Sequence, residues 1–432
     1  MFLNRQTLYL RPDPARVVVR PFKPTPEPRD LKPTDKARAN HIVGRVLSLD
    51  SDTAEQQLAD VLENFEGRHR NLLEIFERRA VEMEGALEPH AVLTKTQRYL
   101  VGAYFLHEYS FEASALFNPS IVRHPDQSDA TVGGCRFILS LRAVGEGHIS
   151  SLTFRSGSIA ADGAVTIDPT GRLASVAKIT RRTARPDGED VEVSFSPDED
   201  LSERVIFPIT EAQANGIEDA RFVEFEDEGR KTFYATYTAY SGRAIRSELL
   251  ETSDFRSFRM RPLRGTATRN KGMGLFPRKI DGRYAMIGRQ DNENLHLIYS
   301  DDLYTWDGGQ SFVRPAYPWE FVQIGNCGSP IELDEGWLLL THGVGPMRSY
   351  AIGAMLLDLH NPLKVIGHLR EPLIAPLGDE RDGYVPNVVY TCGAMVHGNQ
   401  LFIPYAQADK STGISVVDLG RLIDRLLDSG RG

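Results

Sequence analysis

Apolar residues in the first quarter of the chain recur at the spacing of amphipathic helices. Between residues 53 and 84 they are Leu58, Val61, Leu62, Phe65, Leu72, Leu73 and Phe76. Gly67 interrupts the pattern, so we predict either one long helix or two short ones. A further helix is predicted from residue 94 to about 111, where crowded apolar residues indicate burial on most sides. Helical patterns are then almost absent until residue 419.

From residue 117 onward the pattern changes to short alternating or β-rich runs separated by Gly, Asp and Asn, which is typical of an all-β domain. Four runs resemble one another: GRKTFYATYTAY from Gly229, DGRYAMIGR from Asp281, DEGWLLLTHG from Asp334 and HGNQLFIPYAQ from His397. A fifth run, CRFILSLRAVGEG from Cys135, is followed by a large insertion. A period of about 50 residues with several strands in each unit predicts a five-bladed β-propeller. The alternative is an irregular β-sandwich whose strands resemble one another by chance.

These patterns predict two domains. Residues 1–116 would form an N-terminal extension, and residues 117–432 a five-bladed propeller with a short C-terminal helix. Within the extension, residues 14–36 are rich in proline and charge and are predicted to be an extended arm. The helices have too little sequence for a large core of their own, so their apolar faces are expected to pack on the propeller or on another copy of the chain. We therefore predict a homo-oligomer.

Composition narrows the class of protein. The 432 residues are 41% hydrophobic and 25% charged, as in folded globular proteins. The net charge of -9 argues against binding to nucleic acid or to anionic membrane. Cys135, Cys327 and Cys392 lie far apart, which argues against a zinc site or a disulfide framework and fits a reducing cytoplasm. Polar residues interrupt every apolar run, so neither a signal peptide nor a membrane span is expected.

Polar residues at the starts of the blades are the first candidates for a functional site, because the first strands of a propeller line its central channel. In GIEDAR, Glu218 and Asp219 precede an apolar strand. A carboxylic acid walled by apolar neighbours has a raised pKa and can act as the general acid of glycosidic bond cleavage. For an isolated Glu-Asp pair, a turn-capping carboxylate or one paired with Arg221 is the better-supported alternative.

Basic residues of two neighbouring blades form a second candidate set. Arg269, Lys271 and Arg289 belong to one blade, and His342 belongs to the next. Together they would suit phosphate or another anion, although each alone is more often a surface charge or a structural histidine. Asp409 lies in an exposed loop, where it would bind sugar hydroxyls or only turn the chain. The segments GVGP and AVGEGH lack the spacing of a nucleotide-binding loop and are predicted to be turns. We find no convincing set of metal ligands.

Taken in order, GIEDAR, TYTAYSG, NKGMGLFPRKIDGRYAMIGR, SDDLYTW, GSPIELDEGWLLLTHGV, GAMLLDLHNPLKVIG, EPLIAP and VPNVVYTCGAMVHGNQLFIPYAQAD strongly resemble glycoside hydrolase family 130. This family contains the mannoside phosphorylases and related β-mannosidases. The resemblance covers residues 117 to 426 and implies a five-bladed propeller that acts on β-mannosides. The N-terminal extension is similar to that of some members, where it often serves assembly.

The resemblance implies roles for individual residues. Asp219 would be the proton donor and would protonate the leaving oxygen through the 3-hydroxyl of the bound mannose. Inorganic phosphate, the only co-substrate implied, would attack the anomeric carbon from the opposite face and give α-mannose 1-phosphate with inversion. The implied phosphate contacts are Lys271 and His342, with Arg289 and Arg269 as weaker placements. The residues assigned to substrate binding are Asn118, Arg142, Glu218, Arg221, Asn270 and Asp409.

The chain departs from the family pattern at three positions. Ala220 replaces a proline, Gly272 replaces the aspartate after the lysine, and Thr341 replaces the tyrosine before the histidine. The retained cations favour a phosphorylase. The last two departures and the nearby carboxylates of Glu224, Glu226 and Glu293 keep an inverting β-mannosidase open as the alternative. A silent carbohydrate-binding propeller is a third hypothesis. The residues do not decide between β-1,2 and β-1,4 linkages, or which sugar is the acceptor.

Overall fold

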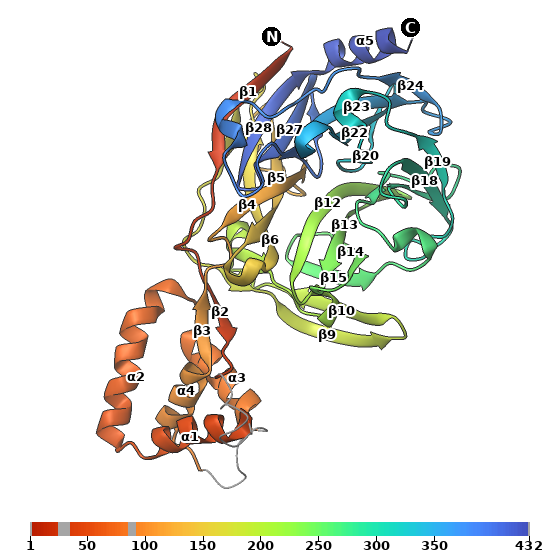
Figure 1. Ribbon diagram of the computed structural model, residues 1–432. Helices are drawn as coiled ribbons and strands as arrows, with labels where there is room; N and C mark the ends of the chain where they lie inside the picture. Colours follow the sequence, from red (N-terminus) through yellow and green to blue (C-terminus); the bar gives the residue numbers. More distant parts are fainter. Residues whose placement is uncertain (1, 25–34, 85–91, 431–432) are drawn as a thin grey trace. The chain divides into compact units, whose positions relative to one another are not determined.

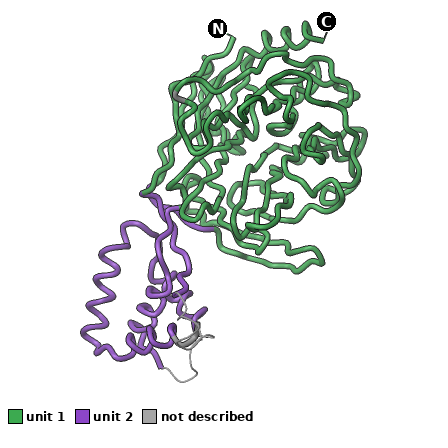
Figure 2. Tube along the Cα trace, in the orientation of Figure 1, with its two compact units in different colours: residues 1–14, 111–171, 177–432 green, residues 15–110, 172–176 purple. Residues whose placement is uncertain are grey.

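The computed structural model describes residues 2–24, 35–84 and 92–430. The chain divides into a β unit of residues 1–14, 111–171 and 177–432, and a helical unit of residues 15–110 and 172–176 (Figure 2). The β unit consists mainly of strands, so the predicted all-β pattern beyond residue 117 is confirmed. In the described ranges, every helix is too short or too polar to cross a membrane.

The helical unit contains the helices that the apolar pattern predicted, and one more. Its elements are α1 (Asp35–Leu47), α2 (Ser51–Phe65), α3 (Leu72–Glu84), α4 (Lys95–Tyr104) and the short strands β2 (Val18–Pro21), β3 (Leu106–Tyr109) and β8 (Ser175–Val176). The predicted break at Gly67 is confirmed, because a short 3₁₀ turn at Glu66–Arg68 follows α2. The last helix ends at Tyr104, earlier than predicted, because the next residues pair with β2 as strand β3. Much of the predicted arm, residues 25–34, lies outside the described residues.

The helices have a core of their own. Its buried members are Ala39, Val43, Val46, Ala54, Leu100, Val101 and Phe105. Helix α1, which the sequence analysis did not predict, supplies Ala39, Val43 and Val46, and α4 supplies Leu100 and Val101. The helices therefore bury part of their apolar surface against one another, and the sequence analysis did not predict this core because it omitted α1. Packing of their other apolar faces on the propeller or on another copy, and the homo-oligomer inferred from it, stay predictions.

The β unit is built from groups of consecutive strands. The first group is β4 (Ala115–Arg123), β5 (Cys135–Val144), β6 (Ser150–Ile159), β7 (Val165–Ile167) and β11 (Arg204–Ile206). The second is β12 (Gly216–Asp227), β13 (Arg230–Tyr240), β14 (Ile245–Thr252) and β15 (Ser257–Pro262), extended by β10 (Gly188–Ser194) and β9 (Lys178–Arg185). The third is β16 (Gly274–Leu275), β17 (Tyr284–Gly288), β18 (Leu295–Ser300) and β19 (Gln310–Val313), and the fourth is β20 (Gln323–Asn326), β21 (Ile331–Leu333), β22 (Gly336–Val344), β23 (Tyr350–Leu357) and β24 (Val365–His368); the fifth is β25 (Val389–Tyr390), β26 (Met395–His397), β27 (Gln400–Gln407) and β28 (Ser411–Asp418). Strands β6 and β12 pair at one position, Ser150 with Gly216, and this single pairing joins the first two groups into one hydrogen-bonded sheet.

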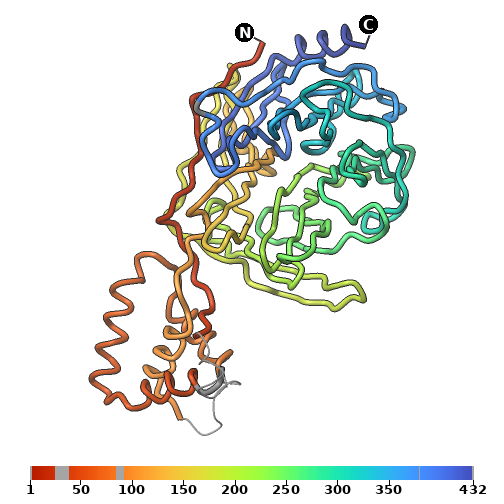
Figure 3. Tube along the Cα trace, in the orientation of Figure 1, coloured from red at the N-terminus to blue at the C-terminus, as the bar shows by residue number. Residues whose placement is uncertain are grey.

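The five sequence repeats fall on equivalent strands. They form β5, β13, β17, β22 and β27, and each of these pairs antiparallel with the strand or strands just before it. In Figures 1 and 3 the groups follow one another in chain order around a common centre. The repeat period therefore corresponds to a repeated structural unit.

The N-terminal strand joins the last group of strands. Strand β1 (Leu3–Leu10) pairs antiparallel with β28, next to the C-terminal helix α5 (Leu419–Ser429). Arg5 on β1 forms an ion pair with the buried carboxylate of Glu380, which also accepts a hydrogen bond of 2.8 Å from the hydroxyl of Tyr405. The first residues of the chain thus belong to the β unit and tie its last strands to the N-terminus.

Candidate functional site

Most of the residues selected from the sequence line one cavity of about 150 Å³ in the β unit. They are Asn118, Arg142, Asp219, Lys271, Arg289, His342 and Asp409. These residues come from all five groups of strands or from the loops that lead into them. The cavity also holds residues that the sequence analysis did not select: Arg348, Tyr350, Val385, Val388 and Tyr390.

Irregular backbone places the two central side chains. Asn118 on β4 and Asp219 on β12 have φ angles of 47° and 53°, in the left-handed region that few residues other than glycine adopt. At both positions the pairing with the next strand shifts register, as in a β-bulge. The amide Nδ2 of Asn118 donates to Oδ1 of Asp219 over 2.6 Å. The same distortion in two repeats therefore brings two polar side chains into contact in the cavity.

Asp219 is surrounded by cations. Burial alone would raise the pKa of this carboxyl, but the charges of Arg142, Arg221 and Lys271 and the bond from Asn118 outweigh it and lower the pKa to about 2. Nη1 of Arg142 lies 3.3 Å from Oδ1 of Asp219. The raised pKa that the sequence analysis expected is therefore wrong, because Arg142 and Lys271 come from other parts of the fold and add their charges to that of Arg221. The site holds Asp219 as a carboxylate.

Glu218, which precedes Asp219 on β12, contacts two of the cations. Nη2 of Arg142 donates to Oε1 of Glu218 over 2.7 Å, and Nζ of Lys271 lies 3.8 Å from its Oε2. Nε of Arg142 also donates to the hydroxyl of Ser150 over 2.9 Å. Glu218 does not line the cavity itself, so its contacts orient Arg142 and Lys271 instead.

His342 is neutral and adjoins Arg289. Burial lowers the pKa of His342 well below its ordinary value, and the charges of Arg289 and Arg221 lower it further. Its Nε2 lies 3.3 Å from Nη1 of Arg289 and can accept a hydrogen bond from it. The ring stacks at 6.1 Å on Tyr350. The cation of this pair is thus Arg289, while His342 orients it.

Arg221 lies just beneath the cavity. Its Nη2 donates to the hydroxyl of Tyr390 over 2.8 Å, and its Nη1 donates to the carbonyl oxygen of Asp219 over 3.1 Å. Only 3% of Arg221 is exposed, so it stabilises the bulge at Asp219 and supplies positive charge without reaching the solvent. The glycine at 272 has a φ of 92°, and a side chain there would lie 3.7 Å from Nε of Arg289. Gly272 therefore adds no carboxylate at a position that lies beside the guanidinium of Arg289.

Asp409 is the second carboxylate of the cavity. Burial and the charge of Asp219 raise its pKa to about 6, although Arg142, Arg348 and Lys271 oppose the shift. It lies between β27 and β28 with a φ of 52°. The two carboxyl groups of the cavity therefore differ in protonation: Asp219 is ionised, whereas Asp409 takes up a proton near pH 6.

The remaining selected residues lie outside the cavity. The side chain of Asn270 holds the loop that carries Lys271: its Nδ2 donates to the carbonyl of Arg289 over 2.8 Å, and its Oδ1 accepts from the amide of Lys271 over 2.8 Å. Arg269 is exposed and does not line the cavity. Of the carboxylates considered as hydrolytic bases, Glu224 and Glu226 line a separate hollow of about 670 Å³.

The cavity residues that sequence reasoning missed had weak signals. Arg348 follows the segment GVGP, which was predicted to be a turn; its first two residues end β22, and its proline opens the 3₁₀ helix η7 at Pro346–Arg348. Tyr390 lies in the segment VPNVVY, which contributed to the family resemblance only as part of a longer motif. Both could have been found by asking which side chains the connections of equivalent repeats direct toward the centre.

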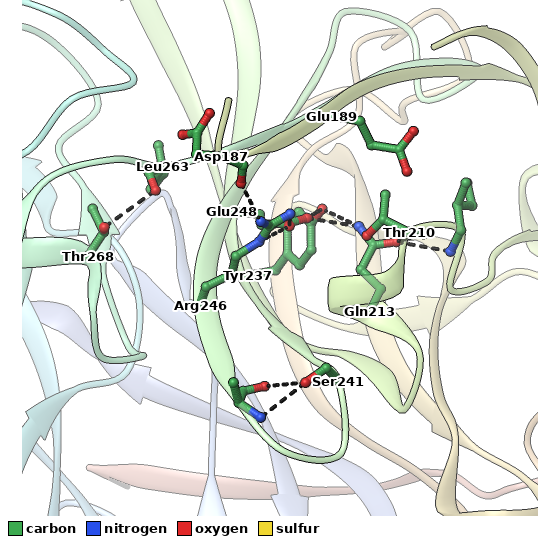
Figure 4. A network of polar contacts seen from close by, with 12 residues as sticks. Asp187, Glu189, Thr210, Gln213, Tyr237, Ser241, Arg246, Glu248, Leu263 and Thr268 are labelled. Atoms are coloured by element: carbon green, nitrogen blue, oxygen red, sulfur yellow. Dashed lines mark hydrogen bonds and ion pairs between the residues drawn. The ribbon is translucent and has the colours of Figure 1, made fainter. Parts of the chain in front are cut away.

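A buried polar network supports the strand that carries Asp219. Gln213, in a turn just before β12, donates from Nε2 to the hydroxyl of Tyr237 over 2.9 Å and to Oε2 of Glu248 over 2.8 Å (Figure 4). Tyr237 also donates to Glu248, and Nε of Arg246 donates to the same carboxylate over 2.6 Å. The main chain of Asp187, in the β9–β10 hairpin, accepts from Arg246 over 2.9 Å. These bonds hold the turn, β13, β14 and the hairpin in one arrangement.

Among the described residues, we find no cluster of three or more His, Cys, Asp or Glu side chains that could hold a metal ion. The cavity is instead lined by cations and two carboxylates, together with an asparagine, a histidine, two tyrosines and two valines. Such a lining suits an anion together with a polyhydroxylated ligand.

Comparison with known proteins places this site in a family. Residues 195–427 match the family model described as β-1,4-mannooligosaccharide phosphorylase. A 1,2-β-oligomannan phosphorylase from Thermoanaerobacter sp. is 32% identical over 223 residues, which are 51% of this chain and 74% of the relative. A β-1,2-mannobiose phosphorylase from Listeria innocua is 30% identical over 231 residues, 51% of this chain and 63% of the relative.

Solved structures agree on the fold. The β-1,2-mannobiose phosphorylase from Listeria innocua, solved with β-1,2-mannobiose, superposes with a TM-score of 0.52 at 23% identity and covers 72% of this chain and 92% of its own. The family contains mannoside phosphorylases and also hydrolases that target β-1,2-mannosidic linkages. The matched segment and the 32% identical relative establish that the chain belongs to glycoside hydrolase family 130, the family of the mannoside phosphorylases.

Proposed function

We propose that this protein catalyses the inverting phosphorolysis of β-linked manno-oligosaccharides to α-mannose 1-phosphate. The observation that carries the proposal is the composition of the cavity, in which Lys271 and Arg289 line the same space as Asp219. Two cations side by side in a small cavity suit an anion, and inorganic phosphate is the anion that a mannoside phosphorylase consumes.

In this proposal, Asp219 delivers the proton to the leaving oxygen through the 3-hydroxyl of the bound mannose. A carboxylate with a pKa of about 2 cannot do so until its surroundings change. Phosphate bound between Lys271 and Arg289 adds negative charge beside Asp219 and offsets the field of the cations, which raises the pKa of Asp219. The acid is then protonated only when the nucleophile is in place. His342 accepts from Arg289 and holds its guanidinium toward the phosphate.

The sugar is bound by the other polar groups. Asn118 and Arg142, both in contact with Asp219, reach hydroxyls near the cleaved bond. Asp409 accepts hydrogen bonds from further hydroxyls of the mannose. Glu218, Arg221 and Asn270 act indirectly, because each holds a cavity residue or its loop in place.

Hydrolysis is the second candidate, and one observation favours it. Asp409 lines the cavity with a pKa of about 6, so at neutral pH it is largely an ionised carboxylate that could accept a proton from water. Against this, the cations remain beside it, and Glu224 and Glu226 line the other hollow. Phosphorolysis is therefore the function that we favour.

We also propose that the five groups of strands are the blades of a propeller. Segments of the β unit that line the cavity continue into the larger hollow, which is lined by residues such as Ile121, Phe222, Pro277, Ser329 and Gly393. Strands that run from one opening to the other are expected around a central channel. The predicted domain boundary after residue 116, assembly through the helical unit and a cytoplasmic location stay predictions.

The linkage is expected to be β-1,2 or β-1,4, because relatives described by both names match the chain. The test is product analysis on a panel of both kinds of manno-oligosaccharide, with and without inorganic phosphate. Asp219→Asn should abolish turnover, with losses on the order of 10²- to 10⁴-fold. Glu226→Gln, on the same strand but in the other hollow, is the matched control and should retain activity.

Mannose 1-phosphate that forms only with phosphate and is lost in Asp219→Asn would support the proposal. Free mannose released at the same rate without phosphate would overturn it in favour of hydrolysis. Turnover that survives in Asp219→Asn would remove Asp219 from the acid role.

A further inference from the structure

A short segment, residues 383–388, borders the mouth of the cavity. Val385 and Val388 line the cavity, whereas Tyr384, which directly precedes Val385, is 67% exposed. The amide of Val385 donates to the carbonyl of Ala408 over 3.1 Å, which places the segment beside the turn that carries Asp409. The carbonyl of Asn387 accepts from the amide of Tyr350 over 2.9 Å, so the segment is held on its other side as well.

The ring of Tyr384 is supported by a histidine from another group of strands. Its centroid lies 5.4 Å from that of His148, with an angle of 35° between the rings. His148 ends the 3₁₀ turn that follows β5, the strand of Arg142, and its φ is 58°. Tyr384 thus presents a solvent-exposed aromatic ring that contacts a second ring and directly precedes Val385 of the cavity lining.

An equivalent turn in the fourth group of strands carries Arg348. Both turns connect the second and third long strands of their group and have the same hydrogen bond across the base, from Gly145 to Ile149 and from Gly345 to Ser349. In the second turn, Arg348 has a φ of 55° and lines the cavity. Residues held in the left-handed region cost free energy and tend to occur where function requires them.

The proposed reaction leaves one part of the substrate without a binding partner. Phosphate and the mannose that is transferred occupy the cavity, whereas the leaving sugar must extend through its mouth. The faces of sugar rings carry apolar C–H groups that pack on an aromatic ring, and a guanidinium supplies several donors to hydroxyls.

We propose that Tyr384, supported by His148, is the platform for the leaving-group sugar of the manno-oligosaccharide, and that Arg348 binds its hydroxyls. This inference rests on the proposed function. It identifies the side chains that determine which acceptor sugar is used in the reverse reaction, and these side chains are separate from the phosphate contacts at Lys271 and Arg289.

The test compares Michaelis constants in both directions of the reaction. Tyr384→Ala should raise KM for the oligosaccharide and for the acceptor sugar by roughly three- to tenfold, and leave KM for phosphate unchanged. Tyr384→Phe keeps the ring and should behave as the original protein. Phe321→Ala is the matched control, because Phe321 is 62% exposed in the same unit and does not line the cavity.

The Arg348→Ala variant shows whether Arg348 binds the sugars or phosphate. A rise in KM for the oligosaccharide and the acceptor alone supports the proposal, whereas a rise in KM for phosphate alone would make Arg348 a phosphate contact and overturn its part. Unchanged constants in Tyr384→Ala, with the original protein active, would overturn the platform. No phosphorolysis by the original protein would instead refute the proposed function. Circular dichroism checks that each variant is folded.

Discussion

Replacing Asp409 by asparagine should stabilise the protein at pH 8 and leave its stability unchanged at low pH. Asparagine has nearly the shape of a protonated aspartate but cannot ionise. In the folded protein, burial and the charge of Asp219 raise the pKa of Asp409 from 3.8 to about 6. The ionised form is therefore disfavoured in the cavity relative to the unfolded chain.

The sign follows from proton linkage. Below pH 3.8 the carboxyl is protonated in both states and contributes nothing to the pH dependence. As the pH rises toward 6, the unfolded chain ionises first and gains free energy that the folded protein does not, so stability falls. The separation between 3.8 and about 6 corresponds to at most about 3 kcal/mol above pH 6. Solvent at the mouth of the cavity screens the charges, which brings the expected gain to about 1 to 3 kcal/mol.

The assay is urea unfolding at pH 4.5 and pH 8, with calorimetric midpoints as a second measure. At pH 8 the Asp409→Asn midpoint should rise by a few degrees, whereas at pH 4.5 most of the difference should disappear. Asp424→Asn, at an exposed position on α5, is the control and should give no comparable difference between the two pH values. Turnover should fall, because the carboxylate is lost from the cavity, so stability is gained at the expense of activity.

An Asp409→Asn protein that is equally stable or less stable at pH 8 would refute this reasoning. The same holds for a gain of equal size at both pH values, which would indicate a packing effect independent of charge. In either case, Asp409 would be an ordinary ionised carboxylate that is well compensated by its cationic neighbours.

Three further predictions concern other parts of the structure. Lys271→Ala should raise KM for phosphate roughly 10- to 100-fold while the fold is retained, as measured by initial rates against phosphate concentration. Gly102→Ala should destabilise the helical unit by about 1 to 3 kcal/mol, because the added Cβ would lie 2.0 Å from the carbonyl oxygen of Phe76; loss of helical circular dichroism on heating measures this. Arg155→Ala should cost about 3 to 5 kcal/mol in urea unfolding, because it leaves the buried carboxylate of Glu112, 3.0 Å away, without this partner. Unchanged unfolding curves or rates would contradict the respective predictions.

The sequence was sufficient to predict helices and strands wherever the signal is local or repeats along the chain. The break between α2 and α3 follows from Gly67, and the repeated aromatic runs fall on equivalent strands because strand alternation and turn residues recur with each repeat. Helix α1 was missed although Ala39, Val43 and Val46 have helical spacing, because the proline-rich residues before it dominated the interpretation. Because α1 was omitted, the core that the helices share was not predicted.

Membership of the candidate site was also largely predictable, because residues at equivalent repeat positions converge when the repeats do. Asn118, Asp219, Lys271 and Asp409 share one cavity, as expected from their places in the pattern. Tyr384 was not predicted, because its contact with His148 joins residues more than 200 positions apart in the sequence.

The charge state of the site was decided only by the tertiary structure. The sequence around Asp219 shows apolar neighbours and predicts a raised pKa, but folding brings Arg142 and Lys271 from other strands against the carboxyl and lowers it. The same folding buries Asp409 beside Asp219 and raises its pKa. Hydrophobic periodicity is a property of neighbouring residues and can be read along the chain, whereas a pKa depends on charges and solvent within a few ångströms in space. The sequence alone therefore determined the repeats and the candidate residues, and the fold determined which of the two carboxyl groups has the raised pKa and which the lowered one.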